Sequence, residues 1–143
     1  MPNLVSRKIA PGATLWFEDR VGKSERIFKT AWFTKASKKA HITDDELCIA
    51  IRQVMLGQAD DLGGGIFKKR LDKNQHRSII LAKGGRYWVY EYLFAKKDRE
   101  NIEDNELVKF RRLAKSYETL SNRQIDELLQ DDLWMEICDG GKA

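Results

Sequence analysis

The chain has 143 residues, 42% of them hydrophobic and 34% charged, with a formal net charge of +4. These values indicate one soluble globular domain with enough chain to bury a single moderate core. No apolar run approaches the roughly 20 residues that a membrane-spanning helix needs. The first residues also lack the apolar core of a secretion signal, so we expect a cytoplasmic protein without a membrane partner.

The predicted domain begins after the first 25 residues. Residues 1–25 have mixed composition and a turn-like segment at residues 10–13, and we assign them to an N-terminal extension. Residues 26–140 form the predicted domain. Apolar and polar residues alternate over residues 26–33, which predicts a first strand, and a short helical turn is expected over residues 34–39.

A helix and a glycine turn follow. The sequence Thr43-Asp44-Asp45-Glu46 fits a capping box, and the apolar positions after it predict a helix that ends near Gly57. Residues 60–65 read as a flexible turn with three consecutive glycines. The glycines do not indicate a phosphate-binding loop, because no Gly-Lys-Ser/Thr follows them.

The middle of the chain predicts three strands, over residues 66–71, 77–82 and 86–95. Gly84 and Gly85 predict a hairpin turn between the last two. The last strand places its aromatic residues on one face, and we expect it to be central in the sheet. That set comprises Trp88, Tyr90, Tyr92 and Phe94.

Two helices and a short strand complete the predicted domain. Apolar residues at helical spacing predict one helix after Asp104 and another from a capping box at Ser121. Residues 134–137 read as a final edge strand. This order predicts an α+β domain with helices packed on one face of an antiparallel sheet.

The two cysteines fit no metal-binding spacing. We expect Cys48 and Cys138 each to be a small buried apolar residue. Neither a metal nor another cofactor is expected.

Positive charge is concentrated in the predicted strands. Residues 1–67 carry ten basic and eight acidic residues, residues 68–99 carry ten and three, and residues 100–143 carry six and eleven. A sheet would gather the middle set on one surface, which suits a polyanion such as nucleic acid. A solvated sheet face is the alternative interpretation.

Residues 94–102 read F-A-K-x-x-R-x-N-I and lead into a predicted helix near Glu106. The glycine turn is followed by Lys68-x-Arg70 and, seven residues later, by the strand that Arg77 opens. Together these segments resemble the RelE/ParE superfamily of bacterial toxins from type II toxin–antitoxin pairs. The likeness runs over residues 26–137.

The resemblance implies a RelE-like, microbial ribonuclease-type fold and a ribosome-dependent endonuclease that cuts messenger RNA. In such enzymes a 2′-hydroxyl attacks the adjacent phosphorus, leaving a cyclic phosphate and a free 5′-hydroxyl. The implied partners are the ribosome, mRNA and a cognate antitoxin that forms a hetero-oligomer with the toxin.

The resemblance also implies roles for individual cations. We expect Arg70 and Arg77 to clamp the scissile phosphate. Lys68 or Lys97 would supply or accept a proton, if neighbouring cations lower its pKa. The predicted contacts to flanking phosphates or ribosomal RNA are Lys69, Lys73, His76, Lys96 and Arg99.

Several side chains have more than one interpretation. Some relatives carry a tyrosine where this chain has Ile102-Glu103-Asp104, so His76 or Glu91 could be the general base instead. Glu91 is more simply a counter-ion for Arg70 or Arg77. Tyr87 and Tyr92 could stack on bases, although core packing is the simpler role.

Two other functions are compatible with the sequence. A gyrase-poisoning toxin could use the same fold, but such relatives lack the cationic cluster. A non-enzymatic nucleic-acid-binding module would need only the positive charge and the strand aromatics.

Overall fold

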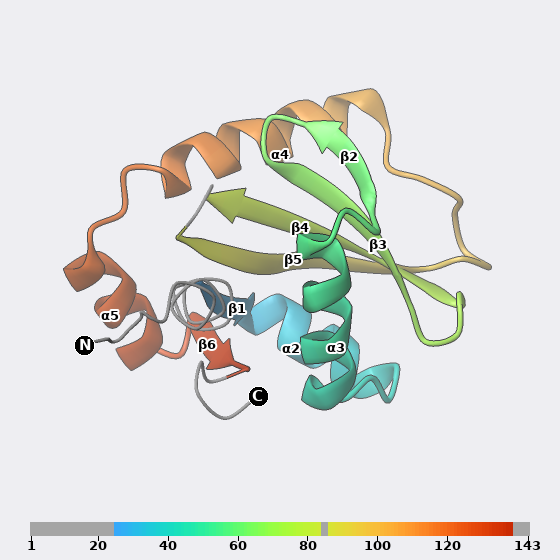
Figure 1. Cartoon of the computed structure of the whole chain (residues 1–143), viewed down its shortest axis with the longest axis horizontal. Coiled ribbons are helices and arrows are strands. Elements are labelled where there is room, and N and C mark those ends of the chain that lie inside the picture. The colour runs from blue at the N-terminus through green and yellow to red at the C-terminus, as the bar shows by residue number, and fades with distance from the viewer. Residues whose placement is uncertain (1–24, 84–85, 139–143) are drawn as a thin grey trace, which may run out of the picture.

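The computed structural model describes residues 25–83 and 86–138 (Figure 1). Strand β1 precedes helices α2 and α3, four strands follow, and α4, α5 and β6 complete the described chain. Their bounds are β1 Arg26–Thr30, α2 Ala31–Lys39, α3 Asp44–Met55, β2 Asp60–Gly63, β3 Ile66–Leu71, β4 His76–Lys83, β5 Tyr87–Ala95, α4 Asp104–Tyr117, α5 Asn122–Gln130 and β6 Trp134–Ile137.

The strands form one six-stranded sheet in the order β2-β3-β4-β5-β1-β6. Only the β1–β5 pair is parallel, and β6 returns antiparallel to β1 as the predicted edge strand. β5 lies inside the sheet, as its apolar sequence predicts. The predicted strand over residues 26–33 is shorter than expected, because Thr30 caps α2 by accepting a hydrogen bond from the Phe33 amide at 3.0 Å.

Helices cover both faces of the sheet (Figure 1). We call the side covered by α2 and α3 the α3 face, and the side covered by α4 and α5 the α4 face. The α+β class is confirmed, but the expectation of helices on one face is wrong. β5 is apolar on both sides, since Tyr90 is fully buried on the α3 face and Val89 on the α4 face.

A β-bulge divides the aromatic residues of β5. Tyr90 and Tyr92 pair with two consecutive residues of β4, Ile80 and Ile79. Glu91 lies between the two tyrosines and has no partner of its own in β4, so it is the extra residue of the bulge. The bulge reverses the alternation of side chains. Trp88 and Tyr90 therefore pack on the α3 face, while Tyr92 and Phe94 pack on the α4 face. The prediction of a single aromatic face is wrong for this reason.

The caps of the predicted helices are confirmed in part. The Thr43 hydroxyl accepts a hydrogen bond from the Glu46 amide at 3.2 Å, as a capping box requires. The Glu46 carboxylate instead accepts a hydrogen bond from the Asp72 amide, so it connects α3 to the loop after β3. α5 begins with the predicted capping box at Ser121.

The glycine segment is more ordered than predicted. Residues 60–63 form edge strand β2, and the glycines make the turn into β3. Gly65 has φ +83, and a Cβ atom there would lie 2.9 Å from the carbonyl oxygen of Ala82. No other residue type fits that position without a shift of the backbone.

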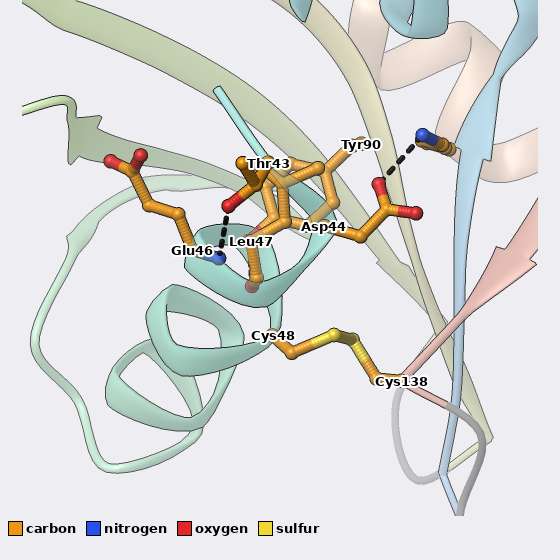
Figure 2. The surroundings of a disulfide bond; sticks show 8 residues. Thr43, Asp44, Glu46, Leu47, Cys48, Tyr90 and Cys138 are labelled. Atoms are coloured by element: carbon orange, nitrogen blue, oxygen red, sulfur yellow. Dashed lines mark hydrogen bonds and ion pairs between the residues drawn. A yellow bond between two sulfur atoms is a disulfide. The ribbon is translucent and has the colours of Figure 1, made fainter. Parts of the chain in front are cut away.

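Cys48 and Cys138 form a disulfide bond (Figure 2). Both residues are half-buried, so the expectation of two separate buried cysteines is wrong. The bond joins α3 to the residue after β6, across 90 residues of sequence. The sheet creates this proximity, because β6 pairs with β1 and α3 covers the same part of the sheet.

Two predictions concern residues outside the described part of the chain. The Gly84–Gly85 turn lies outside it, and so does the expected N-terminal extension except for Glu25, whose carboxylate accepts a hydrogen bond from the Trp88 indole at 2.9 Å. Within residues 25–83 and 86–138, no helix is both long and apolar enough to cross a bilayer.

Candidate functional site

Three predicted catalytic cations lie together on the α4 face. Arg70 of β3 pairs directly with Arg77 of β4, and Lys68 lies two residues before Arg70 on the same side of its strand. Lys68 is opposite Ile79, which belongs to the core beneath α4. Directly opposed side chains in an antiparallel pair have Cβ atoms about 4.5–5.5 Å apart, so the two arginines are close neighbours.

The pairing of Arg70 with Arg77 costs stability, because like charges repel across a strand pair. The Arg70 side chain is exposed and makes no hydrogen bond or ion pair with any residue in the described ranges. Two opposed cations without a described counter-ion are suited to bind an anionic ligand between them.

Arg77 is buried and also holds the loop between β3 and β4. Its Nη1 donates hydrogen bonds to the carbonyl oxygens of Asn74 at 2.9 Å and His76 at 3.3 Å. Asp72, Lys73 and Asn74 in this loop all have positive φ angles. Such backbone is strained in non-glycine residues, and strained backbone occurs frequently at functional sites.

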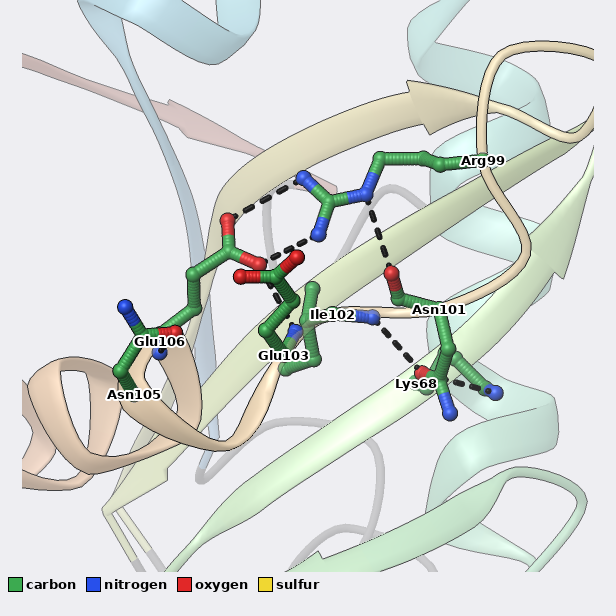
Figure 3. Close-up of polar contacts among 7 residues, drawn as sticks. All are labelled: Lys68, Arg99, Asn101, Ile102, Glu103, Asn105 and Glu106. Atoms are coloured by element: carbon green, nitrogen blue, oxygen red, sulfur yellow. Dashed lines mark hydrogen bonds and ion pairs between the residues drawn. The ribbon is translucent and has the colours of Figure 1, made fainter.

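Arg99 joins this cluster from the loop after β5 (Figure 3). Its guanidinium carbon lies 5.5 Å from the centre of the Phe94 ring, and Phe94 pairs with Arg77 across the sheet. Asn101 connects the two sides of the cluster. Its carbonyl oxygen accepts a hydrogen bond from Arg99 Nε at 3.0 Å, and its side-chain Oδ1 accepts one from Lys68 Nζ at 3.3 Å.

Arg99 is paired with Glu106 at the start of α4. Nη1 donates to Glu106 Oε2 at 3.1 Å and Nη2 donates to Oε1, which makes a bidentate pair (Figure 3). These hydrogen bonds raise the pKa of Arg99 and lower the pKa of Glu106. The pair orients the guanidinium before any ligand binds.

The other predicted cations divide into two sets. Lys73, Lys96 and Lys97 are exposed on two neighbouring loops, which the hydrogen bond from the Lys96 amide to the Gln75 carbonyl connects at 2.8 Å. Lys69 points to the α3 face and donates to the Gln58 carbonyl at 2.9 Å. Burial lowers the pKa of Lys69, and the adjacent Arg70 lowers it further.

The alternative general bases lie away from Arg70. His76 opens β4 on the side opposite to Arg77, and its Nδ1 is 3.0 Å from Asp72 Oδ2. Glu91 accepts a hydrogen bond from the Tyr117 hydroxyl at 2.7 Å and has no ion pair with a described arginine. The counter-ion interpretation of Glu91 is therefore wrong.

Comparison with known proteins identifies the family. The family model described as the RelE toxin of the RelE/RelB toxin–antitoxin system matches residues 25–137. The chain belongs to the RelE toxin family. No match was found among curated proteins or solved structures. The family assignment and the six-stranded α+β fold both agree with the resemblance in the sequence.

Some features of this RelE-family site were not predicted from the sequence. Asn101 belongs to the recognised motif, yet nothing in the sequence indicates that it connects Lys68 to Arg99. Nothing in it indicates that Glu106 pairs with Arg99 either, although a glutamate in the first turn of a helix is a common capping residue.

Replacing Glu91 with glutamine is expected to flatten the pH dependence of stability in this RelE-family toxin. Burial raises the pKa of Glu91 above its ordinary value of about 4.5, and the Tyr117 hydrogen bond opposes that rise only in part. The folded state thus binds more protons than the unfolded state in the window between the ordinary and the raised pKa. Stability from this group is present below that window and falls as pH rises through it.

The measurement is urea denaturation of both proteins from pH 4 to pH 8. E91Q should lose less stability than the wild type as pH rises, since glutamine can still accept the Tyr117 hydrogen bond. Parallel curves for the two proteins would contradict the assignment.

Proposed function

We propose that this RelE-family toxin is a ribosome-dependent endoribonuclease that cuts mRNA and is inhibited by a cognate antitoxin. The observation that carries the proposal is the grouping of Lys68, Arg70 and Arg77 on one face, with Arg99 beside them. Membership of a family named for toxin–antitoxin systems supports the assignment and the antitoxin partner. The basic surface favours an antitoxin with an acidic or helical segment that lies across it.

The reaction we propose is an internal transfer. The 2′-oxygen of one nucleotide attacks its 3′-phosphorus, and the bond from phosphorus to the 5′-oxygen of the next nucleotide breaks. The products are a 2′,3′-cyclic phosphate and a 5′-hydroxyl. No water, metal or redox partner enters this balance: the 2′-hydroxyl loses a proton, and the leaving 5′-oxygen gains one.

The cluster can meet the electrostatic need of this reaction. Negative charge increases on the phosphoryl oxygens in the transition state, and preorganised cations stabilise it. Arg70 would bind these oxygens in a bidentate manner, with Arg77 below it and Arg99 on the side of β5. We assign proton donation to the leaving oxygen to Lys68. Its Nζ donates a hydrogen bond to the side chain of Asn101, which also binds Arg99, and lies 3.6 Å from Asp60 Oδ2.

The exposed cations would extend the contact surface. Lys97 and Lys96 lie on the loop after β5, and Lys73 lies on the neighbouring loop. We propose that they contact flanking phosphates of the message or ribosomal RNA.

Mapping of RNA ends on programmed ribosomes tests the proposal. Purified toxin is added to ribosomes stalled on a defined message, with and without the candidate antitoxin, and the ends of the fragments are characterised. Cleavage within codons that needs the ribosome, yields 5′-hydroxyl ends and stops with antitoxin is the expected result. Intact message would overturn the proposal, and DNA damage in toxin-expressing cells would then indicate gyrase poisoning.

A further inference from the structure

A hollow of about 610 Å³ lies between α2 and the end of β5. Its walls combine aromatic and basic side chains, and two of them, Lys97 and Arg99, also belong to the cationic loops of the candidate site. Lys39 at the end of α2 adds a third cation from the opposite side. Asp98 is the one acidic residue among the described lining residues. Because Arg99 is paired with Glu106, the net positive charge of the hollow comes from Lys39 and Lys97 against Asp98, and this charge is complementary to nucleic-acid phosphates.

The main aromatic feature of the hollow is a stacked pair, Trp32 on Tyr92. Their ring centres are 5.0 Å apart and their planes differ by 25°. Trp32 is nevertheless 51% exposed, because only one face of the indole contacts Tyr92. Single exposed apolar residues are common, but this one is held in a fixed orientation beside three cations.

The stacked pair is connected directly to the cationic cluster. Tyr92 packs against Phe94 and Phe110 with ring centres 6.0 Å and 5.9 Å away. The same Phe94 ring lies under the Arg99 guanidinium. A ligand on Trp32 would thus be next to the phosphate-binding cations.

We propose that the open face of Trp32 is a stacking site for one unpaired base of single-stranded RNA, with Tyr92 as its support. This inference rests on the proposed function and adds a binding subsite to it. Aromatic side chains bind exposed bases of single strands by stacking, and basic side chains bind the linking phosphates. Here Lys39 and Lys97 would contact phosphates next to the stacked base. Because Tyr92 already orders the indole, little side-chain entropy is lost on binding.

The test uses the full chain and a short oligoribonucleotide that carries 2-aminopurine at successive positions, with 2′-O-methyl groups on the riboses to prevent cleavage. Stacking on Trp32 should quench the fluorescence at one position. Trp32→Ala is expected to weaken binding by about 5- to 150-fold and to abolish that quenching, in line with stacking energies of about 1–3 kcal/mol. Trp32→Phe should retain most of the affinity, since it keeps an aromatic face.

The matched control is Leu56→Ala. Leu56 is also an exposed apolar residue, 76% exposed, but it follows α3 and does not line the hollow. This variant should bind the oligonucleotide like the wild type. Equal affinity and equal quenching for Trp32→Ala and the wild type would overturn the proposal. It would also be overturned if Trp32→Ala lost antitoxin binding but bound the oligonucleotide normally, since the hollow would then belong to the antitoxin interface.

The outcomes also separate the subsite from the proposed function. If Trp32-dependent quenching occurs but message on ribosomes stays intact, the endonuclease assignment fails and the subsite stands. If Arg70→Ala abolishes cleavage while Trp32→Ala cleaves and binds normally, the subsite fails and the endonuclease stands.

Discussion

Replacing Arg70 with alanine is expected to slow mRNA cleavage on the ribosome by about 100- to 1000-fold. Removal of one preorganised donor from a transition state typically costs this much, or about 3–4 kcal/mol. Arg70 is the exposed member of the opposed arginine pair, and its side chain has no hydrogen bond or ion pair with a described residue. Its loss should therefore change the free energy of unfolding by no more than about 0.5 kcal/mol.

Single-turnover cleavage of a defined message, together with urea denaturation, measures both effects. Arg70→Lys should fall between wild type and Arg70→Ala, since lysine keeps the charge and loses the bidentate geometry. Arg123→Ala is the matched control, because Arg123 is a cation on α5 whose side chain is 90% exposed. Full cleavage activity in Arg70→Ala would contradict the assignment of the α4-face cluster as the catalytic site.

Arg70 gives a clearer test than Arg77, although the sequence assigns both to the same phosphate. Arg77 is 8% exposed, and its hydrogen bonds hold the carbonyl oxygens of the β3–β4 loop. An alanine at position 77 would therefore disturb the loop as well as the charge. A loss of activity there would combine a structural and a chemical effect.

Removing the disulfide is expected to lower the free energy of unfolding by about 2–5 kcal/mol. The bond between Cys48 and Cys138 closes a loop of 90 residues, and closing a loop of that length restricts the unfolded chain strongly. It also attaches the end of β6, an edge strand of four residues, to α3. The double variant C48S/C138S should therefore unfold at lower urea concentration than the oxidised wild type.

Urea denaturation with and without dithiothreitol checks this prediction. The reductant should bring the wild type close to C48S/C138S and leave the double variant unchanged. Each single variant should match the double variant, because the bond is lost when either cysteine is replaced. A wild type whose unfolding midpoint is insensitive to reductant would contradict a stabilising role. A reducing compartment would itself favour the dithiol form.

Most of the helices and strands follow from local sequence patterns. Local signals were sufficient for α3, α4 and α5, where a capping residue precedes apolar positions at helical spacing. β3 was predicted with its observed bounds. Alternation along β3 was also sufficient to place Lys68 and Arg70 on one side, because consecutive side chains in a strand point to opposite faces.

Contacts between distant segments of the chain depend instead on how the strands pair and the helices pack. The bulge at Glu91 reversed the faces of β5, and no local sequence pattern specifies a bulge against a distant partner strand. Pairing of β6 with β1 brought Cys138 to Cys48, and packing of α2 at the end of β5 stacked Trp32 on Tyr92. These contacts join segments that are far apart in the chain, so they depend on strand register and helix packing. Local periodicity reports which face a residue occupies, whereas the fold alone determines what lies opposite that face.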